Sequence, residues 1–331
     1  MNIKHTVLSS LLAFSAYCGQ TPAADGPPPP GVSQPSGINL GGTSFYDGFA
    51  GLPGYSYQSY LRYSSASSIR GNSGQKVSAF DDPKISAVQW LNQVTYYSPE
   101  SIGGGAHLGW SLLLPVVALD GTFGSNGASL KDNATGLGDI TAGPLIQFDP
   151  IVDAHGRPVF VQRVSMDFIL PTGKYDEHKD INASSHFFSA NPYWAATWMP
   201  APRWEMSWRW YYLYNFKNND PASSTAQFYQ GRAVEDTQAG QATWVNFTAS
   251  YEFFPNVSAG LNGYYFRQLT DDKVNGSRLE DSREKVLGLG PGLFWKIRPG
   301  DGLWFNVYQE SGVENRAKND LLIQLRVAFH L

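Results

Sequence analysis

Few residues of this sequence have a type and spacing that could support catalysis. Cys18 is the only cysteine, and it lies in an apolar N-terminal stretch that cleavage of a leader would remove. A mature chain without thiols has no disulfides, thiolate metal sites or cysteine nucleophiles. The histidines are scattered, with no paired ligand spacing; they are His5, His107, His155, His178, His186 and His330.

Sequence motifs of common enzyme classes are missing as well. The chain has no phosphate-binding glycine loop, no His-Glu-x-x-His run and no Gly-x-Ser-x-Gly turn. His178 and His186 share an acidic stretch with Glu177, which is more typical of a solvated loop than of a metal site. We therefore predict no catalytic residues, no metal and no cofactor. An enzyme built inside a membrane barrel, with His107 facing the lumen, remains the alternative.

The first 24 residues have the features of a secretory signal peptide. Lys4 supplies the positive start, residues 7–17 form a short apolar region, and Ala23 and Ala24 provide small residues for cleavage. The apolar region is shorter than the roughly 20 residues of a membrane helix. We expect export of the chain after cleavage of residues 1–24.

Composition narrows the class of exported protein. Charged residues make up 16% of the chain, well below the roughly 25% of soluble domains, whereas aromatic residues reach 14%. The net charge is −4 at pH 7, so the chain lacks the basic character of a nucleic-acid-binding protein. No later stretch is both uncharged and long enough for a membrane helix.

Most of the chain alternates between apolar and polar residues with a period of two. In 203–216 every even-numbered residue from Trp204 to Phe216 is aromatic or Met, and the residues between them are mostly polar. A period of two indicates strands, and such segments of about ten residues are typical of transmembrane barrels. We predict about twelve strands. They span 55–64, 85–97, 104–118, 138–148, 159–170, 187–199, 203–216, 240–253, 256–269, 285–298, 302–311 and 319–331.

The predicted connections alternate between short and long. The long ones are richer in Asp, Asn, Gly, Ser and charge; they span 65–84, 119–137, 171–186, 217–239, 270–284 and 312–318. Alternation of this kind is typical of short periplasmic turns and long extracellular loops. A soluble β-sandwich or lipocalin-like barrel is the alternative, but its polar faces would carry more charge. We predict an all-β, transmembrane antiparallel β-barrel over residues 55–331.

Residues 25–54 have no strand alternation and are rich in Pro and Gly. Barrels of about eight strands are filled by side chains, and open pores come with about sixteen. A barrel of intermediate size has a modest lumen that an extra segment could narrow. The Pro/Gly-rich leader is therefore either a plug that folds into the barrel from the periplasmic side or a disordered periplasmic tail.

Two strings are similar to motifs of a known family. They are Gly-Leu-Gly-Asp-Ile at 136–140 and, more specifically, Leu-Pro-Thr-Gly-Lys-Tyr-Asp at 170–176. These strings resemble the "MetA pathway of phenol degradation" family of outer-membrane transporters. The resemblance implies a channel linked with uptake of aromatic or other hydrophobic compounds. Lys174, Tyr175 and Asp176 form either a rim that contacts ligand or a stretch that only shapes the loop.

Alternation also predicts which side chains face the lumen. An Arg facing lipid at mid-depth would cost about 2–4 kcal/mol, so Arg209 and Arg326 must point inward. These polar side chains either pair across the lumen and hold the wall, or form a constriction that orients a substrate. The structural role is favoured, because Arg62 and Arg326 lie on strands that must meet to close the barrel. The predicted lumen residues are Arg62, Gln89, Gln93, Arg163, Asp167, Glu205, Arg209, Asn246, Glu252, Asn262 and Arg326.

The sequence thus predicts a channel of the bacterial outer membrane for passive uptake of small hydrophobic or aromatic compounds. The alternatives are an outer-membrane enzyme and a structural or adhesive barrel that acts through its loops. The expected partners are outer-membrane lipid, lipopolysaccharide and the substrate, and not nucleic acid. The oligomeric state stays open.

Overall fold

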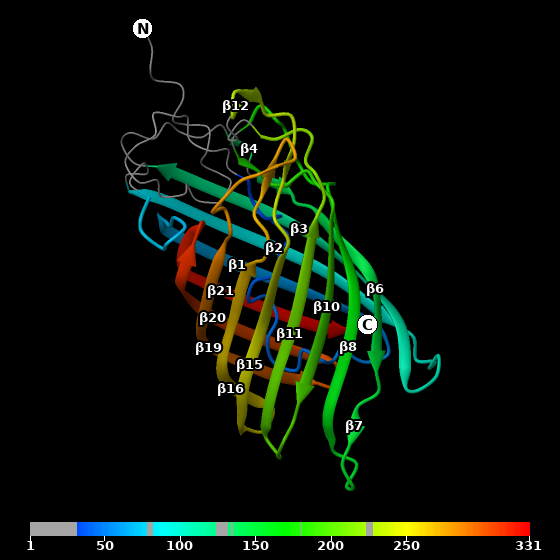
Figure 1. Ribbon diagram of the computed structural model, residues 1–331. Helices are drawn as coiled ribbons and strands as arrows, with labels where there is room; N and C mark the ends of the chain where they lie inside the picture. Colours follow the sequence, from blue (N-terminus) through cyan, green and yellow to red (C-terminus); the bar gives the residue numbers. More distant parts are fainter. Residues whose placement is uncertain (1–31, 78–81, 124–131, 134, 180, 223–227) are drawn as a thin grey trace.

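The computed structural model is a closed antiparallel β-barrel (Figure 1). It describes residues 32–77, 82–123, 132–133, 135–179, 181–222 and 228–331. The expected signal peptide and the first residues of the leader lie outside these ranges. Within the described residues, no helix has the length and apolar character needed to cross a membrane.

Twelve long strands form the wall. Each pairs antiparallel with its neighbours, and β21 pairs with β1 to close the sheet. The predicted all-β barrel of about twelve strands is confirmed. The wall strands are β1 (Gly54–Ile69), β2 (Pro83–Tyr97), β3 (Ala106–Phe123), β6 (Ile140–Phe148), β8 (Pro158–Leu170), β10 (Ser189–Trp198), β11 (Trp204–Asn215), β15 (Ala242–Phe254), β16 (Val257–Gln268), β19 (Lys285–Arg298), β20 (Asp301–Glu314) and β21 (Ala317–His330).

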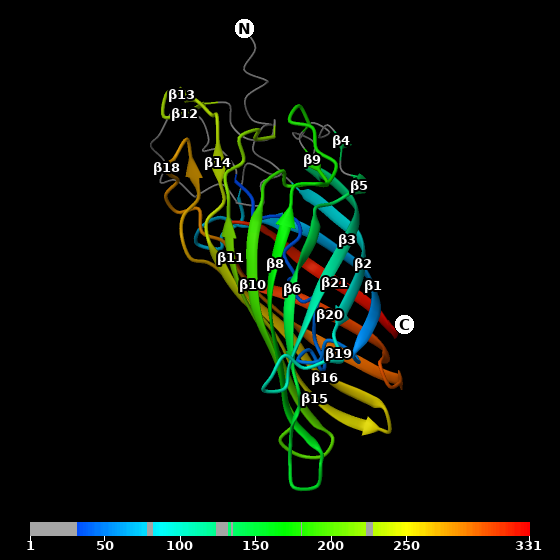
Figure 2. The same ribbon diagram turned by 90° about the vertical axis from the view of Figure 1, so that its right-hand side faces the viewer.

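Short strands extend the wall or pair within the connections at its two ends (Figure 2). β5 adds to β3, and β7 adds to β8. These short strands are β4 (Asp132–Asn133), β5 (Thr135–Leu137), β7 (Ile151–Val152), β9 (Ile181–Asn182), β12 (Phe228–Tyr229), β13 (Arg232–Ala233), β14 (Thr237–Gln238), β17 (Lys273–Val274) and β18 (Ser277–Arg278).

Each strand separates its residues between an apolar outer face and a polar or aromatic inner face. On β11, Trp210 is 58% exposed whereas the adjacent Arg209 is 6% exposed. Successive side chains of a strand point to opposite faces, and a lipid-facing Arg is costly. The aromatic residues of the alternating pattern therefore form the outer surface, and the charged residues face the lumen.

One predicted connection is wrong. The sequence analysis places a long loop at 312–318, but β20 and β21 are joined by a tight turn at Asn315 and Arg316. Asn315 has a φ of 54°, a left-handed conformation that Asn tolerates better than most residues. The strand ends that border the other long connections, those between β1 and β2, β3 and β6, β8 and β10, β11 and β15, and β16 and β19, lie at the same end of the barrel as this turn. We call this end the long-loop end and the opposite end the short-turn end.

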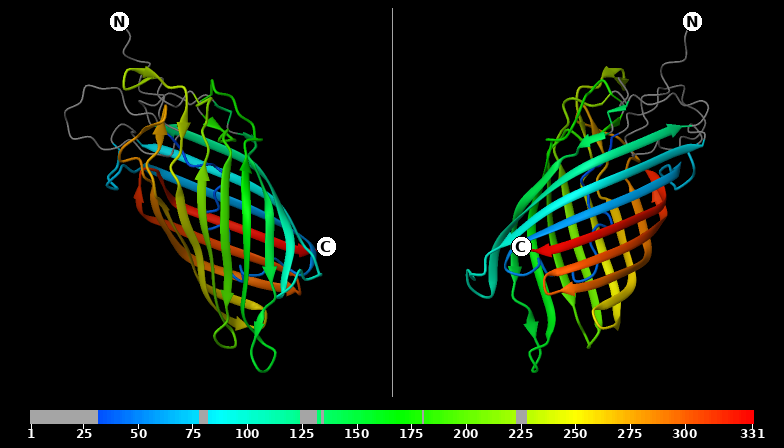
Figure 3. Two further views of the ribbon diagram at one scale, coloured as in Figure 1. Left: turned by 45° about the vertical axis from the view of Figure 1, so that its right-hand side comes forward. Right: turned by 180° about the vertical axis from the view of Figure 1, so that it is seen from behind.

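Residues 32–53, which we call the N-terminal segment, lie inside the barrel (Figure 3). At the long-loop end, Val32 packs in a cluster with Phe187 and Val274. At the short-turn end, the segment leads directly into β1. Between these points it contacts a buried aromatic cluster of the inner wall that includes Trp244 and Tyr308.

Candidate functional site

Side chains of the wall hydrogen-bond the backbone of the N-terminal segment. The backbone N–H of Gly41 donates to Asn246 Oδ1 (3.0 Å). The carbonyl oxygen of Gly41 accepts from the Tyr308 hydroxyl (2.9 Å). Gln324 donates to the carbonyl oxygen of Gly42 (2.9 Å). Buried backbone groups need hydrogen-bond partners. Here the inner wall supplies the partners that secondary structure would otherwise provide.

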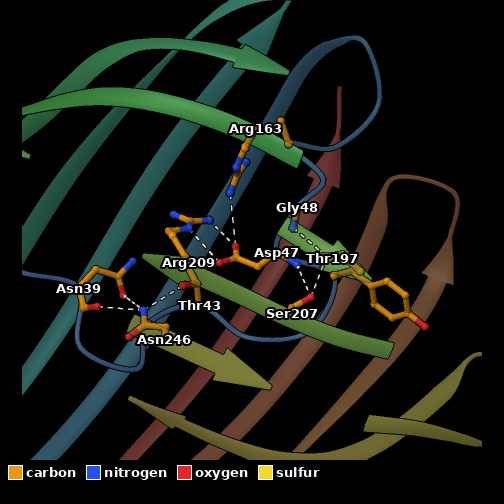
Figure 4. A network of polar contacts seen from close by, with 12 residues as sticks. Asn39, Thr43, Asp47, Gly48, Arg163, Thr197, Ser207, Arg209 and Asn246 are labelled. Carbon is orange, nitrogen blue, oxygen red and sulfur yellow. Dashed lines mark hydrogen bonds and ion pairs between the residues drawn. The ribbon is translucent and has the colours of Figure 1, made fainter. Parts of the chain in front are cut away.

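The charge at the centre of this contact is Asp47, which is 3% exposed (Figure 4). Arg209 donates from Nε to Asp47 Oδ2 (2.8 Å), and a second bond joins Arg209 Nη2 to Oδ1. Arg163 also donates to Oδ1 (3.3 Å). The two-point contact between a guanidinium and a carboxylate is a strong, charge-assisted arrangement. Tyr193 covers it, with its ring centroid 4.5 Å from the Arg209 guanidinium carbon.

The segment approaches the wall most closely at Gly48. Its backbone N–H donates to Thr197 Oγ1 (2.9 Å). A Cβ at residue 48 would lie 2.5 Å from the carbonyl oxygen of Val161 and 2.6 Å from the backbone nitrogen of Thr197. Because both contacts are with backbone atoms of the wall, only glycine fits without displacement of the segment.

Glu205 is fully buried beside this site. It accepts hydrogen bonds from the backbone N–H of Tyr46 (3.0 Å) and from Ser250 Oγ (2.6 Å). A further hydrogen bond comes from Ser207. Three donors from two wall strands and the segment thus satisfy this carboxylate, which takes part in no ion pair among the described residues.

The other predicted lumen residues lie at different depths. Asn262 on β16 donates to Asn306 on β20 (2.6 Å), across the strand β19 that lies between them. Glu252 accepts from the backbone of Asn256 at the short-turn end (2.7 Å). Arg326 stacks over Trp304, with 4.2 Å from its guanidinium carbon to the ring centroid. The remaining ones border two cavities described below, and they are Arg62, Gln89, Gln93 and Asp167.

The wall charges do not pair with one another in the way considered from the sequence. Arg163 and Arg209 share a carboxylate that comes from the N-terminal segment. Asp47 is not among the lumen residues predicted from the sequence. A signal was available, because Asp47 is the only charged residue between positions 26 and 54, and a buried Arg requires an anionic partner.

Two cavities lie between the N-terminal segment and the wall. The larger, of about 290 Å³, lies toward the long-loop end and is bordered by parts of β1, β2, β3 and β21. The smaller, of about 60 Å³, lies deeper and reaches Arg209. Both are lined by Ile38 of the segment and by Arg62, Gln89 and Val117 of the wall, so the two cavities adjoin. Together they lead from the loops to the Asp47 site.

The two family-like strings meet at the long-loop end. Asp139 is 1% exposed, and it accepts from the backbone N–H of Gly173 (3.1 Å) and from Ser185 (2.8 Å). Residue 173 is held so close to Gly138 that an added Cβ would lie 2.6 Å from its carbonyl carbon. The Asp and the Gly of the two strings therefore fasten one connection onto the next.

The predicted rim residues contact their own connection and, through Lys174, the connection between β3 and β6. Lys174 donates to the carbonyl of Thr135 (3.1 Å), and Asp176 accepts from the backbone N–H of His178 (2.9 Å). Tyr175 stacks on His186 with centroids 4.2 Å apart. Burial raises the pKa of Tyr175 to about 12. Its ring also borders the larger cavity, so of the three it is the one placed to touch a ligand there.

His107, the candidate for enzymatic chemistry, lies at the short-turn end. Its Nδ1 lies 2.9 Å from the carbonyl oxygen of Ser98, and its Nε2 lies 3.2 Å from Asp149 Oδ1. These contacts tie two turns together. Among the described residues, no three or more His, Cys, Asp or Glu side chains gather in a group that could hold a metal ion.

A buried acidic group lies where the larger cavity meets the loops. Glu284 is 2% exposed, and burial raises its pKa to about 7 against the opposing effect of Arg316. Arg316 Nη1 lies 3.4 Å from Glu284 Oε2. Burial also raises the pKa of the neighbouring Asp272. This end of the barrel therefore has a carboxyl group, that of Glu284, that changes charge near neutral pH.

Comparison with known families agrees with this architecture. The model of the family described as MetA-pathway of phenol degradation matches residues 66–327. The chain belongs to this family. The match covers the barrel from the end of β1 into β21, and it includes both strings that suggested the family from the sequence. No curated protein matches the sequence.

A solved structure shows the same fold at low sequence identity. The COG4313 outer membrane channel from Pseudomonas putida F1 is 17% identical, with a TM-score of 0.71 over 86% of this chain and 97% of that one. A FadL homologue from Pseudomonas aeruginosa is 7% identical, with a TM-score of 0.38 over 84% of this chain and 90% of that one. The second likeness is too distant to support any conclusion. The first likeness shows that this MetA-pathway family member has the fold of an outer-membrane β-barrel.

Proposed function

We propose that this protein is a channel for passive uptake of small, largely apolar or aromatic compounds through the outer membrane. The observation that carries the proposal is the pair of adjoining cavities between the N-terminal segment and the wall. Their lining combines aliphatic residues such as Ile38, Leu113 and Val117 with many polar and charged residues. Apolar surface that is combined with polar groups able to fix orientation is typical of binding sites for small organic molecules.

The N-terminal segment supports a selective path. It follows the length of the lumen, and the Asp47 contacts lie beside the smaller cavity, which Arg209 borders. A molecule that moves through must therefore pass close to the segment or displace part of it. Such a passage excludes large solutes. It favours compounds that can make apolar contacts with the cavity lining in place of the segment.

The family supports aromatic compounds as the class of substrate, because its description refers to phenol degradation. The long-loop end faces outside in this proposal, since bacterial outer-membrane barrels have short periplasmic turns and longer extracellular loops. The larger cavity is then the outer one, and it receives the compound first.

The proposal is tested by uptake into vesicles whose outer leaflet is lipopolysaccharide, which slows apolar compounds on its own. Vesicles with the purified protein should take up phenol or toluene faster than empty vesicles. Ala87→Trp, which fills the larger cavity from β2, should slow this uptake. The matched control is Ala118→Trp on the outer face of β3. Equal uptake with and without the protein would contradict the proposal.

A further inference from the structure

Within the described ranges of the chain, Arg62 is a buried cation without an anionic partner. It is 8% exposed, and Nη2 donates one hydrogen bond, to the carbonyl oxygen of Leu40 (2.6 Å). Its Nε has no hydrogen-bond partner. A buried charge is costly unless it is paired and hydrogen-bonded. This unfavourable charge is on Arg62, which borders both cavities.

The other buried arginines of the lumen are compensated. Arg163 and Arg209 share Asp47, and Arg316 pairs with Glu284. Arg326 also lacks a carboxylate, but its guanidinium lies between aromatic rings, and it borders neither cavity. Among the described residues, Arg62 is thus the buried arginine that combines an uncompensated charge with open space.

Four of the five carboxylates that border the same cavities are already engaged. Glu310 accepts from the Tyr264 hydroxyl (2.7 Å) and from the backbone of Asn319 (2.6 Å). Asp167 accepts from Ser165 Oγ (2.7 Å). Glu284 pairs with Arg316, and Asp139 is hydrogen-bonded to the loop at 173–185. Asp120 lies in the exposed outer part of β3.

Apolar residues line part of both cavities that Arg62 borders. Ile38, Leu40, Val117 and Leu322 border the larger one, and Leu91 and Leu113 border the smaller one. A guanidinium presents donors in a planar fork that matches a carboxylate. Aliphatic side chains close to an unpaired guanidinium are complementary to a flat apolar molecule with a single acidic group.

We propose that Arg62 binds the carboxylate of a small aromatic acid on its way through the barrel. The ring contacts the aliphatic residues on either side, while the carboxylate accepts hydrogen bonds from the guanidinium at the junction of the cavities. This inference rests on the proposed channel function and narrows its substrate class. It predicts that an aromatic acid is held more tightly than a neutral compound of the same shape.

Benzoate and benzyl alcohol are suitable probes, because they share a ring and differ in charge. The purified full-length protein should bind benzoate in calorimetry, and vesicles that contain it should take up both compounds. Arg62→Gln should weaken benzoate binding about tenfold or more, the equivalent of one charge-assisted hydrogen bond. Uptake of benzyl alcohol should stay within about twofold, since it does not depend on the charge. Arg326→Gln, an equally buried arginine away from the cavities, is the matched control.

A second variant keeps the test informative if Arg62→Gln does not fold. Gln89 lies directly opposite Arg62 in the β1–β2 register. Gln89→Glu supplies an internal carboxylate for the guanidinium and should abolish benzoate binding while the barrel keeps its heat-resistant mobility on gels. The inference would be overturned if Arg62→Gln or Gln89→Glu bound benzoate as well as the wild type does. It would also be overturned if the wild-type protein transported benzyl alcohol but did not bind benzoate. Failure to transport either compound would instead contradict the proposed channel.

Discussion

Asp47 and Arg209, which are 162 positions apart in the sequence, form a buried ion pair inside the barrel. The carboxylate belongs to a segment without regular secondary structure, and the guanidinium belongs to β11 of the wall. Two charges that would each be unfavourable in the lumen become stable through this contact. The pair is therefore the strongest single fastening between the N-terminal segment and the wall.

Loss of the Asp47 carboxylate should destabilise the barrel and loosen the segment. Asp47→Ala leaves Arg163 and Arg209 buried without a partner, a change that typically costs about 3–5 kcal/mol. We expect a lower melting temperature, measured as the loss of heat-resistant mobility on gels, and a higher single-channel conductance. Asp82→Ala, which removes an exposed ion pair with Lys84, should change neither. Unaltered stability of Asp47→Ala would show that the pair does not fasten the segment.

Removal of the segment should open the lumen. A chain without residues 25–50 keeps every wall strand, but it loses the backbone that fills the interior. We expect a severalfold higher conductance in planar bilayers, together with a loss of selectivity between small and large solutes. A conductance equal to that of the full chain would mean that the segment does not obstruct the path.

Replacement of single glycines in the N-terminal segment should show where the segment is packed tightly against the wall. Gly48→Ala places a methyl group against backbone atoms of β8 and β10, so we expect displacement of the segment and a loss of about 1–3 kcal/mol from overpacking. Gly37→Ala is the control, because its nearest neighbour, a side-chain atom of Ile169, is 3.4 Å away. Unfolding in denaturant measures both. Equal stability of the two variants would contradict the tight fit at residue 48.

The outline of the barrel could be predicted from the sequence because its cause is local. Lipid on one side and polar groups on the other force alternation within every strand, as in the residues around Trp210 and Arg209. The turn at Asn315 was missed because Gly312 and Glu314 interrupt the pattern and resemble a loop. The position of Asp47 could not be predicted from periodicity, since its segment has none. Its partners are set by the tertiary arrangement alone.

Stability should depend on pH through Glu284. Burial raises its pKa from 4.5 to about 7, so the native state binds the proton more tightly than the unfolded state. The stabilisation is fully present below pH 4.5 and is lost as the pH rises through about 7. Glu284→Gln should remove up to about 3 kcal/mol of this dependence. Denaturant unfolding between pH 4.5 and 8 measures it, with the exposed Glu177→Gln as control. Identical pH profiles for wild type and Glu284→Gln would disprove the assignment.

The orientation of the barrel is open to a direct test. Peptide tags inserted in the connections at 171–188 and 216–241 should bind antibody on intact cells, because both lie at the long-loop end. A tag in the connection at 199–203, at the short-turn end, should bind only after the outer membrane is broken. Labelling of the short connection on intact cells would reverse the orientation.

The pairing of β1 with β21 has a consequence for the order of assembly. These two strands form the closing seam, in which Tyr60 lies opposite Arg326, and contacts between residues so remote in sequence form slowly. The N-terminal segment is continuous with β1, at that same seam. An open sheet gives the segment easy access to the concave face, whereas a finished cylinder would require it to thread through an end. The segment therefore enters the barrel most easily before the first and last strands meet. While the sheet is still incompletely closed, the segment can also leave the interior again.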